Sequence, residues 1–100
     1  MIEHEGLEWH RLARRDLEEA HGYYSRRSKL AAERFLLAVE EAIEFIQRFP
    51  EGAEISSKRT RSLIIEKYPY SLVYNLDRWG VLIVAVAHQK RRQGYWKRRL

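Results

Sequence analysis

Apolar and polar positions follow different periods along the chain, and each period predicts a kind of element. In residues 6–10, Leu7 and Trp9 alternate with polar neighbours, which indicates a short first strand. From Arg11 to about Arg27, apolar residues recur at steps of four, three and four, and this spacing predicts an amphipathic helix. The residues of that stripe are Ala13, Leu17, Ala20 and Tyr24.

A second amphipathic helix is predicted over residues 29–48, and its apolar face is wide. One stripe consists of Ala31, Phe35, Ala38, Ala42, Phe45 and Phe49, and a second of Val39, Ala42, Ile46 and Phe49. A face this broad can contact both the first helix and a sheet, whereas a coiled-coil seam is narrower. Pro50 ends the helix, because the residue before a proline is disfavoured in helical angles, and a polar loop follows from Glu51. We expect the two helices to form an antiparallel hairpin.

The second half of the chain has the pattern of strands. Residues 62–67 and 70–76 are two predicted strands, separated by Pro69, which cannot donate to a ladder. Residues 81–87 are apolar on both faces and form the predicted central strand. A tight connection over residues 77–80 makes the last two strands an antiparallel hairpin.

The end of the chain adds two local predictions. His88 ends the predicted central strand, and we expect it to share a face with Val84 and Val86 as a half-buried residue that ties down the tail. A short final helix is predicted after Gly94. The element order of one strand, two helices and three strands then predicts an α+β fold. In it the first strand pairs with the central one, and a small antiparallel sheet of about four strands packs against the helical hairpin.

Composition narrows the class of protein. One hundred residues, 45% of them hydrophobic, predict a single domain over residues 1–100. The chain has no cysteine, which excludes disulfides, thiolate metal sites and thiol nucleophiles and suits a reducing cytoplasm. The longest apolar run, Val81 to Ala87, is far shorter than the roughly 20 residues of a membrane-spanning helix, and the first five residues lack the layout of a signal peptide. We therefore expect a cytoplasmic protein with no membrane partner.

The net charge of +5 is distributed unevenly. Residues 1–50 carry 8 Lys/Arg against 10 Asp/Glu, and residues 51–100 carry 11 against 4. Six basic residues and no acidic one lie between Lys90 and Leu100. Such a segment attracts a polyanion, which is either nucleic acid or an acidic protein segment.

The basic half also holds residue types that could cleave RNA. Cleavage through the 2′-hydroxyl needs a proton acceptor, cations around the phosphorane and a proton donor. Cations are present at Arg59, Arg61, Lys67, Arg91 and Arg92, and proton carriers at His88 and Tyr95. No two of these have a spacing that forces them together, so a non-enzymatic protein is favoured over a nuclease. Because no His, Asp or Glu pair has a distinctive metal-ligand spacing, no metal or other cofactor is expected.

Two further side-chain roles stay open in the sequence. Tyr95 and Trp96 either stack on a partner or fold back to cap the sheet. Arg61 either pairs with a carboxylate such as Glu66 or faces a partner.

Three local patterns follow one another along nearly the whole chain. The first is Ala13, Leu17, Glu18 and Tyr23-Tyr24, with Ala32-x-x-Phe35 after them. The second runs from Arg61 to Tyr74 as an arginine, a strand, Tyr68-Pro69-Tyr70 and another strand. The third is Ala85-Val86-Ala87-His88-Gln89-Lys90-Arg91-Arg92 followed by Tyr95-Trp96-x-x-Arg99. Together they resemble the RelE/ParE superfamily of toxins from bacterial type II toxin–antitoxin systems, and the third pattern is closest to the ParE branch.

The resemblance implies a toxin that arrests growth and is neutralised by a cognate acidic antitoxin, within a toxin–antitoxin hetero-oligomer. In the ParE branch the target is DNA gyrase and the toxin is not an enzyme. The target-binding residues would then be Arg91, Arg92, Tyr95, Trp96 and Arg99. In the alternative RelE-type branch the toxin enters the ribosome and cuts mRNA. The catalytic set would then be Arg61, Lys67, His88, Arg91 and Tyr95.

A third alternative is an inactive relative that is retained as a binding module. For an antitoxin, a helical hairpin over a small sheet leaves a groove and an open sheet edge, and both suit an incoming segment.

Overall fold

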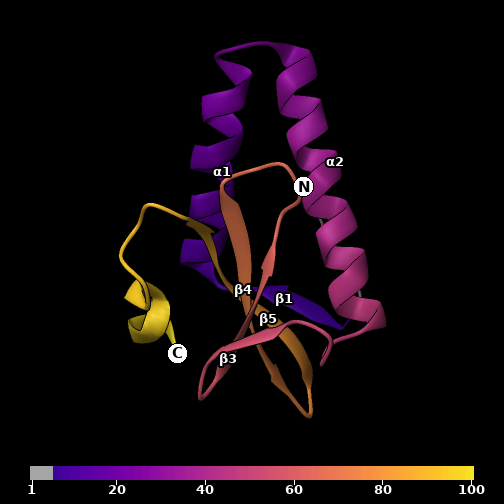
Figure 1. Ribbon diagram of the computed structural model, residues 1–100, viewed down its shortest axis with the longest axis vertical. Coiled ribbons are helices and arrows are strands. Elements are labelled where there is room, and N and C mark those ends of the chain that lie inside the picture. Colours follow the sequence, from indigo (N-terminus) through magenta and orange to yellow (C-terminus); the bar gives the residue numbers. More distant parts are fainter. Residues whose placement is uncertain (1–5) are drawn as a thin grey trace.

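The computed structural model of the protein describes residues 6–100 (Figure 1). The first five residues, on which the signal-peptide expectation rests, lie outside the described residues. The elements are β1 (Leu7–Trp9), α1 (Arg11–Ser25), α2 (Lys29–Arg48), β2 (Glu54–Ser57), β3 (Thr60–Ile64), β4 (Tyr70–Asp77), β5 (Gly80–His88) and the 3-10 helix η1 (Tyr95–Arg99). The predicted α+β class and the final short helix are both confirmed. None of the helices within residues 6–100 is long and apolar enough to cross a membrane.

Side-chain caps at the N-termini of α1 and α2 fix where the two helices begin. The Nδ1 atom of His10 accepts a hydrogen bond from the backbone N–H of Leu12 at 3.0 Å, and the hydroxyl of Ser28 accepts one from the N–H of Ala31 at 2.9 Å. The two helices form the predicted hairpin beside the sheet (Figure 1). The first helix ends at Ser25, about two residues earlier than predicted.

The sheet has five strands in the order β1-β5-β4-β3-β2, and it corrects three predictions. It is mixed, because β1 pairs with β5 in parallel, with Leu7 opposite Val81 and Trp9 opposite Ile83. The connection from β1 to β5 runs through both helices and strands β2, β3 and β4, which is long enough for parallel pairing. A three-residue strand carries no signal of its direction. The additional strand is β2, which was expected to be a polar loop. Every residue of this edge strand is exposed or half-buried, so it shows no apolar alternation. The middle strand of the order is β4, and β5 lies between β4 and β1.

A β-bulge in β5 changes which side chains face the helices. Opposite β4, Val73 pairs with Ala85 and Tyr74 pairs with Ile83, so Val84 is an extra residue. Ile83 and Val86 belong to the core under the helices, whereas Val84 and Ala85 belong to a second, smaller core. The expectation that Val84, Val86 and His88 share a face is therefore wrong for Val84, because the bulge shifts the alternation by one residue.

The second core lies on the face of the sheet that the helices leave open. It contains Val73, Val84, Ala85 and Ala87 from the sheet and Trp96 from η1, with Tyr95 and Leu100 packed against it. We refer to residues 89–100 as the tail. The tail thus covers one side of β5, while α1 and α2 cover the other.

Candidate functional site

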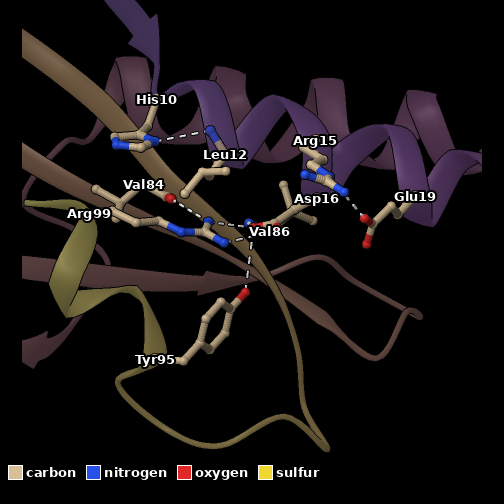
Figure 2. A network of polar contacts seen from close by, with 9 residues as sticks. All are labelled: His10, Leu12, Arg15, Asp16, Glu19, Val84, Val86, Tyr95 and Arg99. Carbon is tan, nitrogen blue, oxygen red and sulfur yellow. Dashed lines mark hydrogen bonds and ion pairs between the residues drawn. The ribbon is translucent and has the colours of Figure 1, made fainter.

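The tail is joined to α1 by a buried ion pair (Figure 2). The Nη1 atom of Arg99 lies 2.7 Å from the Oδ2 atom of Asp16, and its Nη2 atom lies 3.3 Å from Oδ1. Only 9% of the Arg99 side chain and 8% of the Asp16 side chain are accessible to solvent. This two-pronged geometry is the strong form of an Arg–carboxylate contact, and it connects residues that are 83 positions apart.

The same pair also satisfies the free backbone edge of β5. Since β1 ends opposite Ile83, β5 has no strand partner on that side beyond this residue. The N–H of Val86 donates to the Oδ2 atom of Asp16 at 3.1 Å, and the carbonyl of Val84 accepts from the Nη1 atom of Arg99 at 2.9 Å. Figure 2 shows both contacts meeting at the ion pair. Asp16 and Arg99 therefore take the place of a neighbouring strand, which buried backbone groups require.

Tyr95 lies beside the ion pair and between two arginines. Its hydroxyl donates to the Oδ2 atom of Asp16 at 3.4 Å, and the guanidinium groups of Arg91 and Arg99 lie 3.8 Å and 5.1 Å from the ring centroid. Burial raises the pKa of the Tyr95 phenol, and the charge of Asp16 raises it further, against the opposing effect of the two arginines. The phenol is thus protonated at neutral pH and acts here as a hydrogen-bond donor.

Trp96 caps the sheet, one of the two roles that the sequence left open. Only 4% of the residue is exposed, and its ring packs edge-on against that of Tyr95, with centroids 5.4 Å apart. Its indole N–H is buried without a hydrogen-bond partner within the described residues. The ring is held by apolar packing in the second core.

The remaining cations of the tail are exposed to solvent, and the guanidinium of one of them, Arg91, lies on the Tyr95 ring. Exposed basic side chains occur at Lys90, Arg91, Arg92, Lys97 and Arg98, and none of them forms an ion pair within residues 6–100. Gly94, at a φ of 78°, separates them into two groups, one before η1 and one within it. Of the five predicted target-binding residues, the structure leaves Arg91 and Arg92 exposed, half-buries Tyr95 and uses Arg99 and Trp96 inside the protein.

The five residues of the alternative catalytic set lie in different places. His88 is fixed by the backbone N–H of Lys90, which donates to its Nδ1 atom at 3.0 Å, and its ring packs on Tyr70. Arg91 follows in the same turn, with its N–H bonded to the His88 carbonyl at 2.9 Å and its guanidinium on the Tyr95 ring. His88, Arg91 and Tyr95 are therefore near one another.

The other two members are held elsewhere. Arg61, in β3, donates from its Nη1 atom to the carbonyls of Glu51 and Ala53, both at 2.9 Å, so it neither pairs with Glu66 nor is free. Lys67 lies in the turn between β3 and β4, where it lines a groove against α2. The structure brings neither of them to the His88 cluster.

That groove lies between α2 and β3 and has a volume of about 540 Å³. Its lining includes Leu37 and Phe45 of α2 and Ile64 of β3, which are 63%, 38% and 71% exposed. The pairing of β2 with β3 reaches only Ser62, so Leu63 and Ile64 have no strand neighbour on that side. The groove and the open sheet edge expected from the fold are thus both present, side by side.

Asp16 is the functional candidate that the sequence analysis missed. It lies in α1 at the i+3 position from Ala13, within the stripe that also contains Leu17 and Ala20. A carboxylate on an apolar stripe predicts a buried charge, which needs a partner. That signal could have identified Asp16, although not Arg99 as its partner.

Comparisons with known proteins agree with this architecture. A family model described as "ParE toxin of type II toxin-antitoxin system, parDE" matches residues 7–93. A solved structure described as "Chromosomal ParDE TA system from P. aeruginosa" is similar to this chain with a TM-score of 0.61 and 24% sequence identity, over 83% of this chain and 94% of that chain. No curated protein matches the chain. The match to the family model ends just before η1, so the last turn of the tail is outside it.

Proposed function

The chain belongs to the ParE family of toxins of type II toxin–antitoxin systems, and on that premise we propose that it arrests growth by binding DNA gyrase and catalyses no reaction itself. The observation that carries the proposal is the docked tail, which presents five exposed cations and is held to α1 by a buried ion pair. Charge of one sign on a fixed surface favours rapid association with a polyanionic target.

The dispersed positions of the alternative catalytic residues support a non-catalytic mode of action. A ribonuclease needs a base, an acid and phosphate-binding cations around one phosphate. Here Arg61 is occupied by two backbone carbonyls, Lys67 lines the groove at α2, and the phenol of Tyr95 donates to a buried carboxylate. At the cluster of His88, Arg91 and Tyr95, the guanidinium of Arg99 is already paired with Asp16.

We propose that the cognate antitoxin occupies the groove between α2 and β3. A ParDE system implies an antitoxin partner, and the groove combines exposed apolar side chains with an open strand edge. An incoming segment could place apolar side chains against Leu37 and Phe45 and pair its backbone with β3. An acidic segment would in addition be attracted by the basic second half of the chain.

A supercoiling assay tests the proposed target. Purified gyrase, ATP and relaxed plasmid are mixed with the protein, with and without its antitoxin, and both lost supercoiling and trapped linear DNA are scored. Inhibition that the antitoxin relieves supports the proposal. No inhibition at a large molar excess refutes it. Codon-specific mRNA cleavage in cells would then identify the ribosome as the target, and the absence of any growth arrest would identify an inactive binding module.

Two variants in the tail and one matched control link the assay to the tail. Arg92→Glu and Arg98→Glu reverse exposed charges that make no contact with the buried pair. Arg26→Glu reverses an exposed charge at the turn between the helices and serves as the control. We expect the tail variants to inhibit gyrase less and the control to inhibit it like the parent protein.

A further inference from the structure

The exposed side chains of the tail are polar, and its apolar side chains are buried or half-buried. Tyr95, Trp96 and Leu100 pack against the second core, and Arg99 is buried with Asp16. Every exposed side chain of the tail is either cationic or an amide. They are Gln89, Lys90, Arg91, Arg92, Gln93, Lys97 and Arg98.

This separation discriminates between kinds of partner. The centre of a protein–protein interface is depleted of charge, and its binding energy is concentrated in exposed aromatic and aliphatic residues. A nucleic-acid backbone is instead bound mainly by lysine and arginine, with release of counterions. The docked tail presents five exposed cations, of which Arg91 stacks on the half-buried Tyr95 ring, and no fully exposed apolar side chain, which is the composition of a phosphate-binding surface.

From this we infer that the docked tail is a binding surface for the phosphate backbone of duplex DNA, and that Asp16 is the residue that positions it. The inference rests on the proposed function only for the choice of DNA, because duplex DNA is the substrate on which gyrase acts. Arg91, Arg92, Lys97 and Arg98 contact phosphates. Arg99 and Trp96 act from inside by holding those four cations in place.

Asp16 allows positioning to be separated from charge. Replacing it by asparagine removes a negative charge, so an effect of net charge alone would leave DNA affinity unchanged or increase it. Asparagine carries no charge and has one acceptor oxygen, so it cannot replace both oxygens of the carboxylate that bind Arg99 and Val86, and η1 is held less firmly on α1. The inference predicts the opposite sign, a weaker affinity for DNA despite the higher positive charge.

The experiment measures fluorescence anisotropy of a labelled 20-base-pair duplex titrated with the full chain, without gyrase, at several salt concentrations. If three to four phosphates are neutralised, log Kd should change with log salt with a slope of about 3 to 4 in magnitude. We expect Asp16→Asn to weaken binding about tenfold. The double variant Lys97→Ala/Arg98→Ala, which leaves the ion pair intact, should weaken binding at least as much and lower the salt slope by about two.

Two controls accompany the DNA titration, one for the loss of charge and one for the loss of the Asp16 contact. Arg26→Ala/Lys29→Ala removes the same number of exposed charges at the helical turn and should leave the affinity within about twofold. Hydrogen exchange of the Val86 amide reports whether Asp16→Asn has released the contact. If that variant does not fold, the comparison of the two double variants decides alone.

Three results would overturn the inference. They are equal losses in the two double variants, unchanged or tighter DNA binding by a folded Asp16→Asn, and tighter binding of single-stranded RNA than of the duplex. Because no gyrase is present, each leaves the supercoiling result untouched. Conversely, a protein that binds DNA through its tail but does not inhibit gyrase would refute only the proposed target.

Discussion

Leu37 offers a direct test of the antitoxin groove. This residue of α2 is 63% exposed and lines the groove with Phe45 and Ile64. Complete burial of a leucine side chain is worth about 1.5–3 kcal/mol, and roughly two-thirds of the residue remains to be covered by a partner. Leu37→Ala should therefore cost about 1–2 kcal/mol of antitoxin binding, which raises Kd about 5- to 30-fold.

The stability of the fold should hardly change in the same variant. An exposed leucine in a helix makes few contacts, and alanine has the best helix propensity, so we expect a difference within about 0.5 kcal/mol. Calorimetric titration with the antitoxin gives Kd, and urea unfolding gives the free energy of unfolding. Leu30→Ala is the matched control, because Leu30 is 53% exposed on the same helix but does not line the groove. Unchanged Kd for Leu37→Ala, or an equal loss for Leu30→Ala, would refute the placement of the antitoxin.

Three further predictions concern the fold that supports the site. At Gly80, φ is 134° and a Cβ would come 2.4 Å from a backbone oxygen just before β1, so Gly80→Ala should lower the free energy of unfolding by about 2–4 kcal/mol. Gly22 lies inside α1, and Gly22→Ala should raise the free energy of unfolding by about 0.5–1 kcal/mol. Urea unfolding measures both changes. Burial raises the pKa of the Tyr74 phenol, so the folded state holds this proton more tightly than the unfolded state does. The free energy of unfolding should therefore fall as pH rises above about 10, by up to about 1.4 kcal/mol per pH unit for this phenol. Unfolding of Tyr74→Phe between pH 8 and 11 should show a shallower decline, and an identical decline would contradict the argument. Asp16→Ala leaves the buried guanidinium of Arg99 unpaired and should lower the free energy of unfolding by about 3–5 kcal/mol, measured by thermal or urea unfolding. As a control, Arg15→Ala breaks an exposed ion pair and should lower it by less than about 0.5 kcal/mol. Similar losses in both variants would show that burial of the first pair does not matter.

The helices could be predicted from the sequence because their signals are local. Over 15 and 20 residues, the apolar stripes repeat often enough to define both faces, and Pro50 marks where the second helix ends. The hairpin between β4 and β5 was equally visible, because the connection over residues 77–80 lies between two apolar strands. The family resemblance followed from these same segments, and the family model confirms it.

The missed features depend on contacts between distant segments. The edge strand β2 is polar because one side of it has no neighbour, so its sequence resembles a loop. The direction of β1 depends on the path of the chain through both helices and three strands before β5, and not on its own three residues. The bulge at Val84 lies in a uniformly apolar run, where a shift of one residue leaves no trace in the pattern. That bulge decided the face of His88, so one local irregularity changed the predicted surroundings of a candidate site residue.

In the tail, too, the side chains that turn inward depend on contacts with distant segments that the local sequence does not show. The six basic residues between Lys90 and Leu100 are plain in the sequence, but nothing in it distinguishes Arg98 from its neighbour Arg99. In a 3-10 helix, residues three apart lie on one face, so η1 directs Trp96 and Arg99 inward together. Arg98 then points to solvent next to an arginine that is buried.

The face of η1 that turns inward depends on two partners. One is the carboxylate of Asp16 in α1, 83 residues before Arg99, and the other is the backbone of Val84 and Val86 in β5, which β1 is too short to reach. A longer first strand would satisfy Val84 and Val86 itself, and Asp16 and Arg99 would then have no backbone to bind. The brevity of β1 is therefore part of the site. It leaves an open strand edge that the pair of Asp16 and Arg99 fills. This contact holds the tail on α1 and divides its cations into one that holds the structure and five that are exposed.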